Sequence, residues 1–142
     1  MTEQRGVLDT STVVLLRRLD ATALPAEPLI TAITLAELAV GPLVASTDEQ
    51  RAARQAHVQQ AEADFDPLPF DAAAARTSGR VASSLRRAGR KPAARAYDAL
   101  IAAVALSHGL PVHTCNPEDF AGIDDLAVVP VPHPDRVPQQ RE

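Results

Sequence analysis

The sequence predicts an α/β/α sandwich, in which helices cover a mostly parallel central sheet of four to five strands. Short apolar runs, typical of buried strands, alternate with longer helical segments along the 142 residues, and this alternation favours parallel strands joined by helices. The length also suits one domain with a core of its own. We expect this domain to span residues 1–132, and the polar, Pro-rich residues 133–142 to form a disordered tail.

Two strand-to-helix junctions make up the first part of the chain. Arg5–Asp9 is a short apolar strand ending in a carboxylate, and Val13–Leu19 continues as an amphipathic helix. A second strand is expected over Leu29–Ile33, after a loop marked by prolines. The next helix is expected to begin at Thr34, because Thr34-Leu-Ala-Glu37 matches a capping box, in which the Glu side chain folds back onto the helix start.

Helices dominate the middle of the chain. Thr47–Phe65 is polar and is expected to form an exposed helix, one half of a helical hairpin. Asp66–Phe70 is a weak candidate for an edge strand because it contains two prolines. Another helix is expected over Ala72–Ala88, capped by Asp71 and ended by Gly89.

The last part of the chain is organised around a helix that is apolar nearly all round. This helix is expected to begin near Pro92 and to end at Gly109. A short strand over Leu110–Thr114, a polar turn at 116–120 and a final strand over Leu126–Val131 follow it.

Asp98 lies inside this apolar helix. Between Ala96 and Leu106 only Tyr97 and Asp98 are ionisable, and an ionised carboxylate in such surroundings costs several kcal/mol unless it is paired or bound to a metal. A plainer alternative makes Asp98 the N-cap of the helix. Pro92 argues against this alternative, because Pro prefers the first turn of a helix and places the start earlier.

Several carboxylates follow predicted strands. The carboxyl ends of parallel strands are where α/β proteins bind ligands, and carboxylates gathered there repel one another unless a cation neutralises them. An all-oxygen ligand set, without Cys or His, favours Mg²⁺ or Mn²⁺. Helix capping remains an alternative role for Asp9 and for Glu37. The residues expected at this edge are Asp9, Glu37, Asp98, Asn116 and Asp119.

The net charge of −4 argues against a polyanionic partner, but the distribution of charge does not. Residues 72–97 contain no Asp or Glu and hold half of the chain's 14 Lys and Arg. Such a run is either a solvated helix face or a surface that contacts phosphates beside the acidic residues. The candidates for phosphate contact are Arg80, Arg86, Arg87, Arg90, Lys91 and Arg95.

Other classes lack their signatures. One cysteine, Cys115, excludes an intramolecular disulfide and a four-thiolate zinc site. No secretory leader and no run of membrane-spanning length is visible, so we expect a soluble cytoplasmic protein without a membrane partner. The dinucleotide-binding, P-loop, zinc-protease and serine-hydrolase motifs are also absent.

Four motifs occur in the order typical of one known family. They are a strand followed by Asp9-Thr-Ser, then Thr34-x-x-Glu37-Leu, Asp98-Ala-Leu-Ile-Ala-Ala, and Thr114-x-Asn116-x-x-Asp119-Phe120. Together they resemble a PIN domain, and within that family the VapC-type toxins of bacterial toxin–antitoxin pairs. The resemblance covers about residues 7–132.

The resemblance implies a Mg²⁺- or Mn²⁺-dependent endoribonuclease. The metal quartet would be Asp9, Glu37, Asp98 and either Asn116 or Asp119. Many relatives have Asp where this chain has Asn116, so we expect Asp119 to supply the fourth carboxylate and Asn116 to orient a water or to bind the metal directly. Ser11 and Thr114 are expected to support the ligands with their hydroxyls.

The same resemblance implies partners. These are an RNA substrate, a cognate VapB-type antitoxin whose tail enters the acidic groove, a second copy in a homodimer, and a toxin–antitoxin hetero-oligomer.

Three alternative functions remain to be considered. A catalytically weak or inactive PIN domain would bind RNA or protein without cutting. A metal-dependent adhesion module would need a hydroxyl where Val13 stands, and a haloacid-dehalogenase-like phosphatase would need an acid where Ser11 stands.

Overall fold

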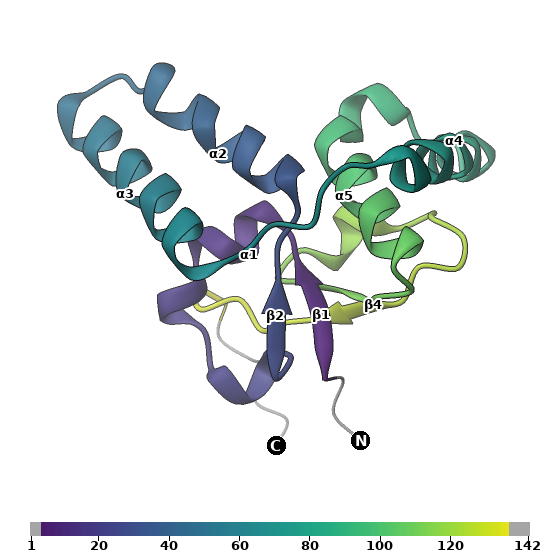
Figure 1. Ribbon diagram of the computed structural model, residues 1–142, viewed down its shortest axis with the longest axis horizontal. Coiled ribbons are helices and arrows are strands. Elements are labelled where there is room, and N and C mark those ends of the chain that lie inside the picture. Colours follow the sequence, from purple (N-terminus) through teal and green to yellow (C-terminus); the bar gives the residue numbers. More distant parts are fainter. Residues whose placement is uncertain (1–3, 137–142) are drawn as a thin grey trace.

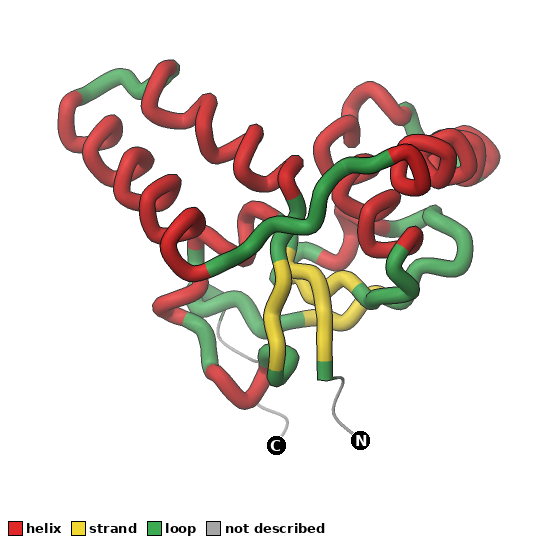
Figure 2. The backbone as a smooth tube through the Cα atoms, viewed as in Figure 1, coloured by secondary structure: helices red, strands yellow, loops and turns green. Residues whose placement is uncertain are grey.

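A four-stranded, all-parallel sheet forms the centre of the protein, in a computed structural model that describes residues 4–136. Neighbouring strands follow the order β2-β1-β3-β4 (Figure 2). Helices flank this sheet, which confirms the predicted α/β/α architecture. The strands are β1 (Arg5–Leu8), β2 (Glu27–Leu29), β3 (Val112–Thr114) and β4 (Val128–Pro130).

β1 is a central strand, although it comes first in the sequence. Val7 pairs with Leu29 of β2 on one side and with Val112 of β3 on the other. Val7 and Leu8 are fully buried. A strand enclosed on both faces is expected to be apolar throughout, and the first polar residue after β1, Asp9, stands where the strand ends.

The start of the second helix differs from the prediction. Helix α2 covers Ala32–Leu43, and its N-cap is Thr31, whose hydroxyl accepts a hydrogen bond from the Thr34 N–H at 3.3 Å. The capping box at Thr34 is therefore wrong, and Glu37 lies well inside the helix. Thr31 itself is extended, and Leu68 pairs with the backbone on both sides of it, so the helix begins directly after this bridge.

The fifth strand, predicted at residues 66–70, is reduced to a single bridge. The Leu68 N–H donates to the Ile30 carbonyl at 2.9 Å, and the Leu68 carbonyl accepts from the Ala32 N–H at 2.8 Å. Pro67 and Pro69 flank Leu68, and prolines of this kind are confined to the edges of sheets.

The two long helices of the middle region lie where they were predicted, and the predicted cap of the second helix is confirmed. Helix α3 (Asp48–Asp64) is capped by Thr47, which accepts from the Gln50 N–H at 3.0 Å. Helix α4 (Ala72–Arg87) is capped by Asp71. α2 and α3 pack as the predicted hairpin (Figure 1).

Short 3₁₀ turns extend or replace parts of the remaining predicted helices. The first helix is α1 (Thr10–Val14), continued by η1 (Leu16–Arg18) rather than by α-helix. The apolar helix is α5 (Ala96–Ser107), preceded by η3 (Pro92–Arg95). The further short turns are η2 (Ala21–Ala23) and η4 (Pro117–Phe120).

Two separate apolar clusters hold these elements together. The larger joins α5 to α4 and the sheet, and residues 101–105 of α5 are fully buried. The smaller lies between the hairpin and the start of the chain, around Ile30, Leu38 and Ala61. In Figure 1 the hairpin lies at the left and the α4–α5 pair at the right, and β1 and β2 point to the region between them.

The predicted tail is described only in its first four residues. Asp135 forms an ion pair with Arg18, and the Arg136 N–H donates to the His133 carbonyl at 3.1 Å. Residues 137–142 lie outside the described part of the chain. In the part that is described, no helix is long and apolar enough to cross a membrane.

Candidate metal centre

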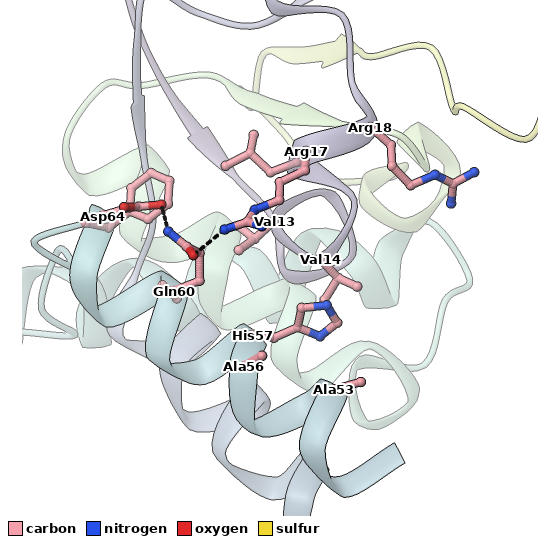
Figure 3. A pocket seen from close by; sticks show the side chains of 12 residues that line it. Val13, Val14, Arg17, Arg18, Ala53, Ala56, His57, Gln60 and Asp64 are labelled. Atoms are coloured by element: carbon pink, nitrogen blue, oxygen red, sulfur yellow. Dashed lines mark hydrogen bonds between the residues drawn. The ribbon is translucent and has the colours of Figure 1, made fainter. Parts of the chain in front are cut away.

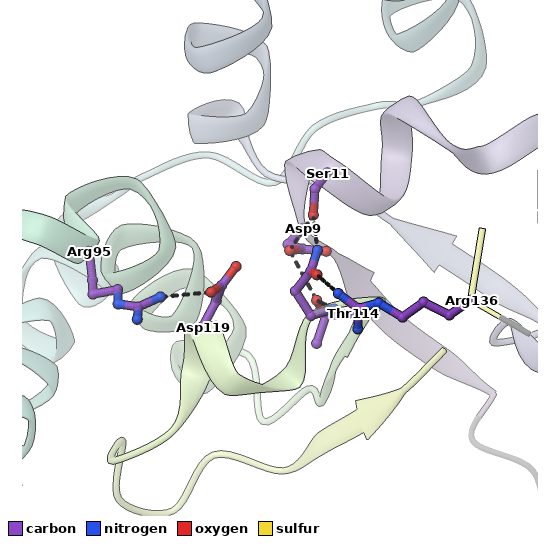
Figure 4. Close-up of polar contacts among 7 residues, drawn as sticks. Asp9, Ser11, Arg95, Thr114, Asp119 and Arg136 are labelled. Atoms are coloured by element: carbon purple, nitrogen blue, oxygen red, sulfur yellow. Dashed lines mark hydrogen bonds and ion pairs between the residues drawn. The ribbon is translucent and has the colours of Figure 1, made fainter. Parts of the chain in front are cut away.

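Asp9 lies at the carboxyl end of β1, in the N-cap position of α1, and is 1% exposed. Its carboxylate accepts hydrogen bonds from the Ser11 hydroxyl at 3.1 Å, from the Thr114 hydroxyl at 3.0 Å and from the Thr12 hydroxyl. Burial raises the pKa of Asp9, and these hydrogen bonds oppose the increase because they favour the charged form. The carboxylate is therefore fixed in place by neutral hydroxyl groups (Figure 4).

Thr12, which the sequence analysis did not single out, joins the ends of β1 and β3. Its buried hydroxyl donates to Asp9 and accepts from the Cys115 N–H at 3.1 Å. Cys115 is buried, and burial raises the pKa of its thiol, so this group is held in its neutral form.

Glu37 projects from α2 toward the start of α1. Its carboxylate accepts a hydrogen bond from the Thr10 hydroxyl at 2.6 Å, and Thr10 Oγ1 also lies 3.1 Å from Thr34 Oγ1. Sequence reading missed Thr10, because a hydroxyl residue directly after a strand is equally well explained as a helix cap.

Asp98 is the third residue of α5, and the N-cap of that helix is Arg95, so the plain-cap alternative is wrong. Burial raises the pKa of the half-buried Asp98 carboxyl to about 7, and the charges of Asp119, Asp9 and Glu37 act in the same direction. Electrostatic influence of this kind falls with distance. The four predicted carboxylates therefore share one region of the molecule.

Asp119, on η4, is held by a cation. Its Oδ1 lies 2.7 Å from Arg95 Nη1, and the two side chains are 38% and 32% exposed. Arg95 also opposes the increase in the pKa of Asp98, as a nearby positive charge must.

Asn116 is linked to Asp9 through Ser11 and Thr114, which also bond to the Asp9 carboxylate. Its side-chain N–H donates to the Ser11 hydroxyl at 3.1 Å, and its backbone N–H donates to the Thr114 hydroxyl at 2.9 Å. Its Oδ1 lies 3.5 Å from Arg136 Nη2, a neighbour for which the sequence offered no signal. Figure 4 shows Arg95 and Arg136 approaching the site from opposite sides.

The carboxylate oxygens of this cluster are ligands that suit a hard divalent cation. The side chains are not, however, arranged as a closed shell around one position. Within residues 4–136, no three Asp, Glu, His or Cys side chains form a ready-made metal shell. The carboxylates of Asp9, Glu37 and Asp119 instead make the hydrogen bonds and the ion pair described above. Mg²⁺ usually keeps several waters and takes only one or two protein carboxylates, so a preformed cage is not required.

The basic residues of segment 72–97 lie in two separate parts of the structure. Arg95 reaches the acidic cluster, whereas Arg80 and Arg87 line a groove with Leu106, at the opposite end of α5 from Asp98. Arg87 also pairs with Asp124, at 2.6 Å.

A second groove, of about 320 Å³, lies between α1 and α3. Val13, Val14 and Ala56 line it, and the Arg17 guanidinium donates to the Gln60 side-chain oxygen across it at 2.6 Å (Figure 3). Because Asp9 lies at the N-cap of α1 and the groove is lined by residues from Val13 onward, this groove lies toward the far end of that helix from Asp9.

The fold and the site together define an α/β/α protein with an acidic cluster at the carboxyl ends of its parallel strands. The family model of the PIN domain matches residues 7–126. Ribonuclease VapC5 of Mycobacterium tuberculosis is 42% identical over 133 residues, which cover 92% of this chain and 96% of that protein. The chain therefore belongs to the PIN-domain family, as a VapC-type member.

Solved structures agree with this placement. The crystal structure of VapBC-5, a member of the VapBC family of toxin–antitoxin systems from Mycobacterium tuberculosis, matches with a TM-score of 0.78 and 41% identity, over 90% of this chain and 99% of that one. DNA-bound VapBC from Salmonella typhimurium matches with a TM-score of 0.66 and 27% identity, over 90% of this chain and 97% of that one.

Proposed function

We propose that the protein is a metal-dependent endoribonuclease and the toxin of a VapBC-type pair. The observation that carries this proposal is the cluster at the strand ends, where three other carboxylates act on the pKa of Asp98. A group of acids without a matching number of cations is stable in its charged form only when it binds a cation. The similarity to ribonuclease VapC5 supports RNA as the substrate.

Asp9, Glu37, Asp98 and Asp119 would hold Mg²⁺ or Mn²⁺. When bound, the metal supplies a nucleophile from water and neutralises charge that develops on a phosphodiester. The hydroxyls of Ser11, Thr12 and Thr114 fix the Asp9 carboxylate, and Thr10 fixes that of Glu37.

Asn116 supports the site as a neutral group beside Asp9. Its amide is held by Ser11, which leaves its side-chain oxygen on the side where Arg136 lies. We propose that this oxygen orients a water and that Asp119 supplies the fourth carboxylate.

Regulation by a cognate VapB-type antitoxin follows from the same relatives, since the matching solved structures are VapBC toxin–antitoxin assemblies. Homodimer formation, a toxin–antitoxin hetero-oligomer and a cytoplasmic location belong to the same proposal.

The test is RNA cleavage by the purified protein with Mg²⁺, with Mn²⁺ and with EDTA, alongside Asp98→Asn. We expect cleavage that requires the metal and that falls at least about 100-fold in Asp98→Asn, because loss of a ligand costs more than loss of a group that only supports one. Asp66→Asn is the matched control: it removes one exposed acid outside the cluster and should leave the rate unchanged.

Each other outcome has a definite meaning. Cleavage that survives Asp98→Asn contradicts the assignment of the site. Absence of cleavage in a protein that still binds Mn²⁺ would favour the alternative, a PIN domain that binds RNA or protein without cutting it.

A further inference from the structure

Arg95 places a positive charge against one of the four carboxylates of the acidic cluster. We propose that Arg95 is an internal counter-ion of Asp119 and that a metal must displace the arginine from this carboxylate. Arg95 would then set the metal affinity of the site. The inference rests on the proposed function, because it assumes that the cluster binds a divalent cation.

The geometry distinguishes Asp119 from its neighbours. Its carboxylate meets a guanidinium at 2.7 Å, whereas the carboxylates of Asp9 and Glu37 accept hydrogen bonds from neutral hydroxyls. A hydroxyl hydrogen-bonded to a carboxylate leaves the negative charge available to a cation. A guanidinium neutralises that charge and occupies a position beside the oxygen.

The pair joins two segments that the sequence holds apart. Arg95 belongs to η3, three residues before Asp98, and Asp119 belongs to η4, after β3. The guanidinium therefore lies where the start of α5 meets the turn that follows the sheet.

Displacement is physically reasonable because the pair is only partly buried. With side chains about a third exposed, the ion pair contributes a modest free energy, since solvent screens it. A divalent cation repels the guanidinium and attracts the carboxylate more strongly than a single charge does. Arg95 is thus strong enough to hold Asp119 in the metal-free protein and weak enough to be released.

The experiment is a Mn²⁺ titration of the full chain by calorimetry, without RNA. We expect Arg95→Gln to bind Mn²⁺ roughly two- to fivefold more tightly than the unaltered protein, which corresponds to the loss of one partly exposed ion pair. Arg95→Lys keeps the charge and should stay close to the unaltered affinity. Arg87→Gln is the matched control, because it removes an arginine with a carboxylate partner, Asp124, at a similar distance of 2.6 Å but away from the cluster.

Thermal unfolding supplies a second readout. Without metal, Arg95→Gln should be less stable, because Asp119 then adds its full charge to the other carboxylates. With Mn²⁺ present it should gain more stability than the unaltered protein does, because tighter binding to the folded state raises the midpoint further.

The outcomes separate this inference from the proposed function. Equal or weaker Mn²⁺ binding by Arg95→Gln, while Asp98→Asn abolishes binding, overturns the role of Arg95 alone. Absence of Mn²⁺ binding by the unaltered protein overturns the metal site itself.

Discussion

At Asp98, burial and three neighbouring carboxylates act in the same direction: all favour the protonated carboxyl group. The raised pKa has a consequence for stability, because the unfolded chain has no such neighbours. Between the ordinary value of 3.8 and about 7, the folded protein binds more protons at this position than the unfolded chain does. Its free energy of unfolding must therefore fall as the pH rises through that window.

Asp98→Asn should remove this pH dependence. In metal-free protein at pH 8 we expect the variant to be more stable than the unaltered protein by about 1–2 kcal/mol, a value reduced for the partial exposure of the carboxyl group. The difference should vanish as the pH falls to about 3, below both pKa values, where the carboxyl is protonated in both states. Urea unfolding in EDTA at several pH values measures this. Parallel pH profiles for the two proteins would show that Asp98 does not carry the effect.

Sequence reading located the acidic residues and two hydroxyl partners of Asp9, Ser11 and Thr114, but not Thr10, Thr12 or the ion pair of Asp119. Three of the acids, Asp9, Asp98 and Asp119, could be located because each stands next to a strand or inside an apolar helix. An ionised carboxylate is costly in such a place unless it is paired or bound to a metal. Arg95 could be seen as a basic residue, but its contact with Asp119 depends on how two 3₁₀ turns meet across 24 positions of the chain. No local pattern encodes that meeting.

Among the elements, α4 carries basic residues that can have two roles, one in stabilising the helix and one in binding. Arg86 and Arg87 lie in its last turn, and both are exposed. Basic residues in the last turn favour the helix by interacting with its dipole. They also form a charged surface at a distance from the acidic cluster, and we propose that flanking phosphates of a longer RNA bind there.

Replacing both Arg86 and Arg87 with Gln should weaken RNA binding and reduce its salt dependence, by a slope of about 0.7 for each phosphate of a single strand that the protein no longer neutralises. Mn²⁺ affinity should not change, because neither residue reaches the cluster. Binding measured at several salt concentrations tests this, with Arg51→Gln on the exposed α3 helix as the control. An unchanged slope would remove this part of the basic segment from the RNA-binding surface.

The start of a helix was predicted accurately where local contacts determine it. The caps at Thr47 and Asp71 depend on hydrogen bonds to an N–H three residues away, which the sequence displays directly. The start of α2 depends instead on Leu68, a distant partner that pairs on both sides of Thr31. Because Thr occurs at both 31 and 34, the local pattern alone selected the wrong cap.

On the scale of the whole molecule, two apolar clusters stabilise different parts of the fold. The main cluster joins α4, α5 and the sheet, and the smaller one holds the α2–α3 hairpin against the beginning of the chain. The hairpin extends away from α4 and α5 in Figure 1. Regions with little buried apolar surface open more readily than the core does.

We therefore expect amide hydrogen exchange to distinguish the two parts. Amides of the hairpin should exchange through a local opening with a weak dependence on denaturant, whereas those of residues 101–105 in α5 should exchange only on global unfolding. Native-state exchange followed by mass spectrometry at increasing urea measures both. Identical opening free energies and denaturant slopes for the two parts would show that the molecule opens as one unit.

The central position of β1 also determines when the protein becomes complete during synthesis. The Thr114 hydroxyl that supports Asp9 is separated from it by 105 positions, and a ribosome adding about 5–20 residues per second needs roughly 5–20 s to cover that distance. Asp119 is made later still. A nascent chain therefore lacks the complete acidic cluster until Asp119 has been made, and the proposed nuclease activity of that chain cannot begin before this point.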